Sequence, residues 1–268
     1  MPKSPDFIGF RAGLLGDKPL RLDLLANEKD WFALHKPSGI PGQAHPWYAG
    51  KMDVSAALRL QLEEGKEELK RLQIPQSHYI CGPDLEVPGP VIFAKNKTMA
   101  DRFKNALGSD QLEFRFLFVS GGQISHSELE CHLPLALHRE KPLALVSHRT
   151  GKKSLTRYRL LAKIPYLSLW EAVTTFPRMH QIRLHAAECG ISIKDDILYG
   201  NTTSDEQQNH RIANRLPVFS GFSLCLQSVD LGQCVPGFPV VCAEFPKRFE
   251  AFLKKCGFSE SAWKTCQK

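Results

Sequence analysis

Aromatic and β-branched residues gather in short apolar segments along the chain, and Gly, Pro or polar residues bound these segments. Such composition is typical of β-strands, and residues 168–176 also alternate between apolar and polar positions as a strand does. The pattern predicts strands within residues 30–39, 90–95, 112–122, 143–148, 154–164, 168–176, 219–231 and 240–245.

A smaller set of segments repeats its apolar residues with the period of an α-helix. Asp53 is a plausible N-cap for the first of them, and a glycine follows the second and the third. The predicted helices are residues 53–72, 97–107, 178–190 and 246–258. Strands with few helices and no regular βαβ alternation indicate an α+β fold. We take residues 1–268 as one domain, and a division into two lobes across a cleft is compatible with the pattern.

The composition is that of a soluble globular protein with an excess of positive charge. The formal net charge is +7 and the sequence pI is near 9.0, which suits a polyanion such as nucleic acid but is shared by many proteins without such a partner. The start has no apolar stretch of signal-peptide length, and no segment reaches the roughly 18 apolar residues of a membrane helix. We expect a cytoplasmic protein. The 8 cysteines form no Cys-x-x-Cys pair, so we expect no metal site.

One carboxylate lies in an unusually stiff segment. Asp84 follows Gly82 and Pro83 in "CGPDLEVPGPVIFAKN", residues 81–96, which continues with more Pro and Gly. From the residue types alone, this composition indicates a turn.

A second segment, residues 178–190, concentrates polar side chains on a predicted helix. Two readings stay open from the residue types: a solvated helix face, or a surface that binds anions or pairs with an acid. The polar side chains are Arg178, His180, Gln181, Arg183 and His185.

This second segment resembles the third motif of the RluA-type pseudouridine synthase family. The family pattern runs Gly-Arg-Thr-His-Gln-Ile-Arg-x-His, then Ala-x-x-Gly, then Gly-Asp-x-x-Tyr-Gly. The chain has "FPRMHQIRLH", "AAECG" and "KDDILYG" in the same order. Other family motifs are similar to "ALHKPSGIPGQAHP", "PDLEVPGPVIFAKN", "GKKSLTRYRLL" and "FPKRFEAFL", so the resemblance covers about residues 28–253.

The resemblance implies a fold, an activity and a catalytic pair. The fold is α+β, with a mixed and mostly antiparallel sheet of the pseudouridine synthase type, flanking helices, a central cleft and no separate N-terminal RNA-binding module. The activity is isomerisation of uridine to pseudouridine in structured RNA (rRNA or tRNA), without metal or organic cofactor. By this resemblance, Asp84 is the catalytic carboxylate and Arg183 its partner. Such a pair is physically sensible, since a nearby guanidinium keeps a dry carboxylate ionised.

We expect RNA as the partner, no membrane contact, and a monomer. The basic loop at residues 148–153 would hold phosphates that flank an extruded base. The expected substrate-binding side chains are Arg115, Phe116, Lys152, Lys153, Arg178, His180, Gln181 and Tyr199.

The chain departs from the family pattern at two site positions. Gly82 stands where the family has an Arg, and Arg115 stands where it has a Tyr, between Phe114 and Phe116. These departures favour a second hypothesis, a catalytically inactive RNA-binding protein on the same scaffold. A third hypothesis, a hydrolase with Asp84 and Glu86 as paired carboxylates, has no other support in the sequence.

Overall fold

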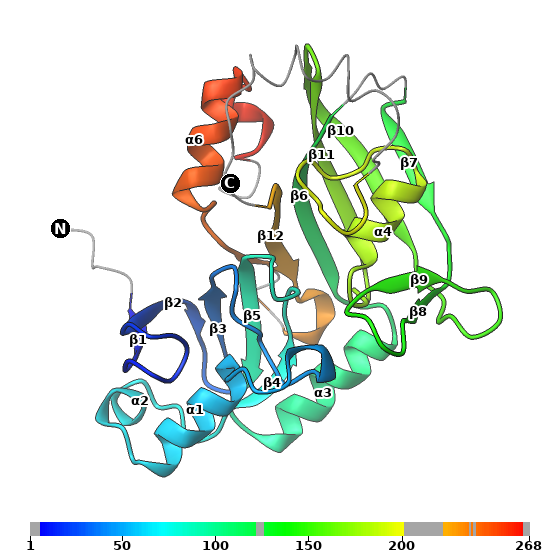
Figure 1. Cartoon of the computed structure of the whole chain (residues 1–268). Helices are drawn as coiled ribbons and strands as arrows, with labels where there is room; N and C mark the ends of the chain where they lie inside the picture. Colours follow the sequence, from blue (N-terminus) through cyan, green and yellow to red (C-terminus); the bar gives the residue numbers. More distant parts are fainter. Residues whose placement is uncertain (1–5, 122–125, 201–221, 236, 238–239, 265–268) are drawn as a thin grey trace. The chain divides into compact units, whose positions relative to one another are not determined.

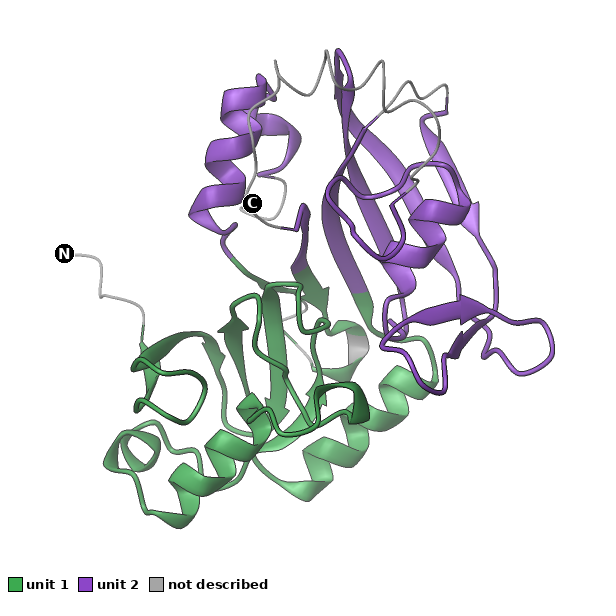
Figure 2. Ribbon diagram, in the orientation of Figure 1, with its two compact units in different colours: residues 1–113, 228–243 green, residues 114–227, 244–268 purple. Residues whose placement is uncertain are grey.

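The computed structural model describes residues 6–121, 126–200, 222–235, 237 and 240–264 (Figure 1). The chain forms two compact units (Figure 2). Unit 1 consists of residues 1–113 and 228–243, and unit 2 of residues 114–227 and 244–268. Each unit combines helices with an antiparallel sheet, which confirms the predicted α+β class; the single domain over residues 1–268 stays a prediction. None of the described helices is long and apolar enough to cross a membrane.

Unit 1 is built on a five-stranded sheet with the order β1-β2-β3-β5-β4, in which every neighbouring pair is antiparallel. The strands are β1 (Phe7–Phe10), β2 (Leu20–Asn27), β3 (Trp31–Lys36), β4 (His78–Cys81) and β5 (Gly89–Ala94). The helical segments are η1 (Pro46–Tyr48), α1 (Val54–Glu63), α2 (Glu67–Arg71), α3 (Lys97–Gly108) and η2 (Gly232–Cys234).

Alternation along β3 divides the core of unit 1 between the two faces of its sheet. Trp31 meets Phe103 of α3 edge to face, with ring centroids 6.3 Å apart. Phe32 points the other way and stacks on Phe93 at 5.1 Å, in the apolar cluster to which α1 and α2 contribute. Helices therefore cover both faces of the sheet.

The outer edge of β1 is occupied by side chains at Gly9. Its N–H donates to Glu68 Oε2 over 2.8 Å. Its carbonyl oxygen accepts from Gln61 Nε2 over 2.9 Å and also from Lys66 Nζ. These side chains come from α1, α2 and the turn between them, so the helical segment is bound to the edge strand.

Unit 2 is built on strands in the order β12-β6-β11-β10-β7. They are β6 (Glu113–Gly121), β7 (Glu128–Cys131), β10 (Thr156–Ile164), β11 (Leu167–Thr174) and β12 (Leu224–Asp230). β12 begins in unit 2 and ends in unit 1, where it pairs with β13 (Val240–Cys242). Unit 2 also contains the hairpin of β8 (Leu135–Leu137) and β9 (Ala144–Val146), and the helical segments α4 (Gln181–Glu188), α6 (Lys247–Cys256) and η3 (Glu260–Ala262).

Among the described residues of unit 2, the helices α4 and α6 lie on opposite faces of the sheet. Leu117 and Val119 of β6 pack in one apolar cluster with Phe252 of α6. The alternate residues of β6 face α4: Phe118 meets Tyr158 at 5.9 Å, and Tyr158 Oη donates to the carbonyl of Ile182.

Two predicted helices differ from the structure, in each case at a residue with positive φ. The helix expected at residues 53–72 is interrupted, because Gly65 adopts φ +70° between α1 and α2. The helix expected from residue 178 begins only at Gln181, because His180 has φ +56° and cannot continue a right-handed helix. Residues 219–221 and 122, which belong to predicted strands, lie outside the described residues.

Candidate active site

Asp84 lies in the connection between β4 and β5 of unit 1. Pro83 precedes it, and the N–H of Val87 donates to the carbonyl of Asp84 over 3.1 Å, which closes a four-residue turn. The turn that the Gly and Pro content predicts is therefore present. It fixes the backbone that carries the carboxylate.

A buried lysine holds this turn from inside the unit. The side chain of Lys36, at the end of β3, is fully buried. Its Nζ donates to the carbonyl oxygens of Val87 at 2.8 Å, Pro37 at 3.1 Å and Leu85 at 3.3 Å. An ammonium has three donors, and all three are used here.

The loop after β3 makes two further bonds to the same turn. Ser38 Oγ donates to the carbonyl of Glu86 over 2.7 Å, and the N–H of Gly39 donates to the carbonyl of Leu85 over 2.8 Å. Together with Lys36 and the turn bond, these contacts engage all four consecutive carbonyls of residues 84–87. The backbone at Asp84 is thus held rigidly.

The electrostatics of Lys36 couple it to the acids of the turn. Burial lowers the pKa of Lys36 to about 7, although the negative charges of Asp84 and Glu86 oppose the shift. Below that pH the Lys36 side chain is a buried cation that binds the turn. The predictions from sequence did not include Lys36.

The missing family arginine has a steric explanation in this chain. A Cβ atom at Gly82 would lie 3.0 Å and 3.2 Å from the two methyl groups of Val91, and 3.3 Å from Tyr79 Oη. A side chain at position 82 would therefore require its neighbours to move. The glycine in place of the family arginine is therefore consistent with the close packing of Val91 and Tyr79 at this position.

The strongest polar feature of unit 2 is a buried pair between Arg183 and Asp196. Arg183 Nε donates to Oδ2 over 2.8 Å and Nη2 donates to Oδ1 over 2.7 Å, with the two side chains 3% and 1% exposed. Oδ1 also accepts from the N–H groups of Leu198 and Tyr199. Burial raises the pKa of Asp196, but Arg183 and these amides outweigh it and hold the pKa below its usual value.

Aromatic and imidazole rings surround the same guanidinium. The centre of the Arg183 guanidinium lies 5.2 Å from the ring centroid of Tyr199 and 4.7 Å from that of Phe222. Arg183 Nη1 lies 3.1 Å from His180 Nε2, and His180 Nδ1 lies 2.9 Å from Tyr199 Oη. Since a guanidinium only donates, Nε2 of His180 is the acceptor and Nδ1 carries the proton. Arg183, His180 and Tyr199, all predicted from sequence, are in direct contact.

Asp195 and Asp196 have different roles in the structure. From the sequence, a turn or helix-capping role is expected for both, rather than a metal pair. Asp196 has this role, since its Oδ1 accepts from the N–H groups of Leu198 and Tyr199, and it also neutralises Arg183. Asp195 has φ +66°, a conformation that favours glycine, and it stands at the Gly of the Gly-Asp-x-x-Tyr-Gly pattern. Its carboxylate binds Lys194 Nζ over 2.8 Å.

The side-chain amide of Gln181 forms its hydrogen bonds with other groups of the protein. Its Nε2 lies within hydrogen-bond distance of Leu155 O, Thr156 Oγ1 and Thr174 Oγ1, and its Oε1 accepts from the N–H of Arg178. The contacts attach the start of α4 to β10 and β11. These bonds indicate that Gln181 positions the start of α4 against the sheet.

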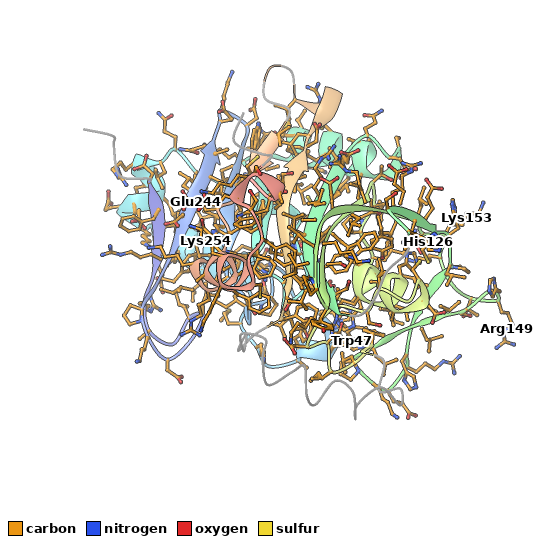
Figure 3. All side chains as sticks on the ribbon, turned by 90° about the horizontal axis from the view of Figure 1, so that it is seen from above. Trp47, His126, Arg149, Lys153, Glu244 and Lys254 are labelled. Atoms are coloured by element: carbon orange, nitrogen blue, oxygen red, sulfur yellow. The ribbon has the colours of Figure 1, made fainter. Side chains whose placement is uncertain are left out.

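The basic loop before β10 is exposed. Lys152 exchanges two backbone hydrogen bonds with Leu135, and the side chains of Lys152 and Lys153 are open to solvent. A Cβ atom at Gly151 would lie 2.3 Å from the carbonyl oxygen of Ser147, so the tight turn requires glycine. Figure 3 shows Lys153 and Arg149 directed away from the body of unit 2.

Arg178 joins this basic loop. Its Nε donates to the carbonyl of Lys153 over 2.8 Å, and its guanidinium lies over Phe176 at 5.0 Å. Lys153 and Arg178 therefore form one cationic surface of unit 2, as their predicted roles require.

Arg115 and Phe116 point to opposite faces of β6. Phe116 is buried on the face that carries α4. Arg115 lies on the other face, where its Nη1 donates to Glu171 Oε2 over 3.1 Å, beside Arg159, which binds the other oxygen of Glu171. Of the two, Phe116 shares a face with the Arg183 cluster.

The two members of the predicted pair belong to different units, Asp84 to unit 1 and Arg183 to unit 2. The pair stays a prediction. In the part of the chain that the structure describes, no group of three or more His, Cys, Asp or Glu side chains has the arrangement of a metal site.

Comparison with known proteins agrees with the motifs. The chain is 24% identical over 184 residues to an uncharacterized RNA pseudouridine synthase of Bacillus subtilis, an alignment that covers 68% of this chain and 59% of that protein. It is 25% identical over 181 residues to ribosomal large subunit pseudouridine synthase C of Rickettsia bellii, with 66% and 56% covered. The chain thus spans less than two thirds of these relatives.

The fold has counterparts among solved structures. Human RNA pseudouridylate synthase domain containing 4 superposes with a TM-score of 0.64 at 15% identity, over 87% of this chain and 92% of that one. The sequence profile of RNA pseudouridylate synthases matches residues 30–188, more than half of the chain, and includes both Asp84 and Arg183. The chain therefore belongs to the RNA pseudouridylate synthase family.

Proposed function

We propose that this chain is an RNA pseudouridine synthase that isomerises uridine to pseudouridine in structured RNA. The observation that carries the proposal is the Asp84 turn, in which four consecutive carbonyls are hydrogen-bonded within a segment that matches the family. A carboxylate on a preorganised backbone suits catalysis, because its geometry is fixed before substrate binds. Of rRNA and tRNA, the similarity to ribosomal large subunit pseudouridine synthase C of Rickettsia bellii favours rRNA.

The reaction rearranges one nucleotide without adding or losing atoms. The bond from N1 of uracil to C1′ breaks, the base rotates, a bond from C5 to C1′ forms, and the proton on C5 moves to N1. Asp84 begins this sequence either by attack on C1′ or by taking a proton from C2′. Arg183 of unit 2 is the proposed partner of Asp84, and Asp196 fixes the guanidinium.

Substrate binding is proposed to use both units. The base must leave its stack to reach Asp84, and the aromatic groups Phe116 and Tyr199 suit contact with the nucleoside. Lys152, Lys153 and Arg178 suit the flanking phosphates, because they form an exposed cationic surface. For Arg115 and Gln181 we propose structural roles, since their side chains form hydrogen bonds with other protein groups.

A second candidate is a catalytically inactive RNA-binding protein on the same scaffold. The packing at Gly82 favours it, because a side chain at the position of the family arginine would require Val91 and Tyr79 to move.

One experiment separates the two candidates. Pseudouridine is mapped in total RNA from cells with the wild-type protein, with Asp84→Ala, and without the gene. Loss of the same sites in both altered strains supports the isomerase and identifies its RNA. If no site changes while the purified protein binds RNA with a salt-dependent affinity, the binding protein replaces the isomerase.

A further inference from the structure

Tyr79 of β4 carries a hydroxyl group with an unusual environment. Its ring packs on Phe93 of the neighbouring strand, with centroids 5.8 Å apart and the planes at 79°. Pairing between β4 and β5 shifts register between Tyr79 and Cys81, just before the turn of Asp84. Irregularities of this kind occur next to active sites, where they re-aim a side chain.

Two glycines lie next to the Tyr79 hydroxyl and place no side chain against it. A Cβ atom at Gly42 would lie 2.9 Å from Tyr79 Cε2 and 3.4 Å from Oη, and one at Gly82 would lie 3.3 Å from Oη. Among the described residues, no hydrogen bond ends at this oxygen. The Tyr79 side chain as a whole is only partly buried.

The hydroxyl lies close to the acid of the candidate site. Burial raises the pKa of Tyr79, and the charges of Cys81, Asp84 and Asp53 raise it further. The phenol is therefore neutral at physiological pH and offers one donor and one acceptor.

Both loops beside the hydroxyl are held by hydrogen bonds. The carbonyl oxygens of Pro41 and Gly42 accept from the N–H groups of Val54 and Ser55, at the start of α1. The Asp84 turn is held by Lys36. The Tyr79 hydroxyl is thus a rigidly placed polar group without a protein partner among the described residues, and such a group is free to bind a ligand.

We propose that Tyr79 is a substrate-binding residue whose hydroxyl hydrogen-bonds the polar edge of the uracil base beside Asp84. This inference rests on the proposed function. Uracil presents O2, O4 and N3–H along one edge, so a neutral phenol pairs with either an acceptor or a donor of the base. The contact orients the base relative to Asp84.

Tyr79→Phe tests the contact, because it keeps the ring on Phe93 and removes only the oxygen. The matched control is Tyr166→Phe, which removes a hydroxyl from a residue that is 50% exposed in unit 2. We expect kcat/KM on the target RNA to fall about tenfold in Tyr79→Phe, as loss of one hydrogen bond predicts, and to stay at the wild-type value in Tyr166→Phe. Equal kcat/KM in all three proteins overturns the proposal.

A binding measurement separates failure of this proposal from failure of the proposed function. The 5 tyrosines are replaced by 3-fluorotyrosine, and fluorine spectra are recorded during titration with uridine 5′-monophosphate. The Tyr79 resonance is identified by its absence from Tyr79→Phe. A saturable shift of this resonance, without one at Tyr166, supports the contact even if the wild type forms no pseudouridine. If the wild type forms none and Tyr79 does not shift, the proposal is overturned.

Discussion

Lys36 Nζ donates a 2.8 Å hydrogen bond to the carbonyl oxygen of Val87, across the turn that begins at Asp84. The bond links the end of a core strand to the segment that carries the candidate carboxylate. Because Lys36 is fully buried and reaches two more carbonyls, the position of Asp84 depends on an amino group that is shielded from solvent.

Lys36→Met is expected to lower the free energy of unfolding by about 2–4 kcal/mol. The change removes the Lys36 donor from the carbonyls of Val87, Pro37 and Leu85, of which Leu85 keeps its bond from the Gly39 N–H. An unpaired carbonyl costs about 1–3 kcal/mol, and relief of a buried charge offsets part of this. Urea denaturation measures it. Lys97→Met, at an exposed position of α3, is the control and should change stability by no more than about 0.5 kcal/mol. Equal stability of both variants contradicts a structural role of Lys36.

The same lysine predicts a pH dependence of stability. Its pKa is about 7 in the folded protein, whereas a lysine in an unfolded chain has a pKa of about 10.4. Between these values the unfolded state binds a proton that the folded state lacks, so stability rises with pH. From pH 7 to pH 8.5 we expect the wild type to gain about 1.5 kcal/mol relative to Lys36→Met. If the free energy of unfolding changed with pH equally in the wild type and in Lys36→Met, a lowered pKa of Lys36 would be excluded.

Asp196→Asn is expected to destabilise the protein by about 3–5 kcal/mol, because it leaves the buried charge of Arg183 uncompensated. The change is measured by denaturant unfolding at pH 7. Asp195→Asn is the neighbouring control: the residue is more exposed, and Asn tolerates positive φ. A loss of similar size in both variants would argue against the pair as the source of stability.

The Arg183 and Asp196 pair also predicts acid sensitivity. The pKa of Asp196 is lowered in the folded state. The stability that it contributes is therefore fully present above the unfolded pKa of about 3.9 and is lost as pH falls through the lowered folded pKa. Acid unfolding of the wild type should be steeper than that of Asp196→Asn, which has no proton to gain at this position.

Asp195→Gly is expected to stabilise the protein by about 0.5–1 kcal/mol. Asp195 has φ +66°, where glycine carries no steric penalty. Loss of the exposed contact with Lys194 offsets little of the gain. Thermal unfolding measures the change, and a lower midpoint than that of the wild type would mean that the Lys194 contact outweighs the backbone strain.

Much of the fold follows from local patterns in the sequence. β5, β6 and β11 are apolar segments with clear ends, and the structure places strands there within a few residues of the prediction. β1, β2, β4, β7 and β8 were missed, because they are short or interrupted by charged residues. Where Gly65 divides a predicted helix, the apolar period continues but the backbone does not.

The site was less predictable, because its contacts join residues that no spacing connects. Arg183 and Asp196 are thirteen positions apart and meet through the fold. The bonds from Lys36 to residues 85 and 87 join segments about fifty residues apart. A motif identifies candidate functional side chains, but only the three-dimensional structure identifies the hydrogen-bond partners of each one.

The capped edge at Gly9 determines how far the sheet of unit 1 can grow. A strand at the border of a sheet normally presents free amide and carbonyl groups, which act as a template for another chain. At Gly9, Glu68 takes the amide, while Gln61 and Lys66 take the carbonyl. A foreign strand would have to displace these three side chains before it could pair there. The helical segment after α1 thus protects this border of the protein against edge-to-edge aggregation.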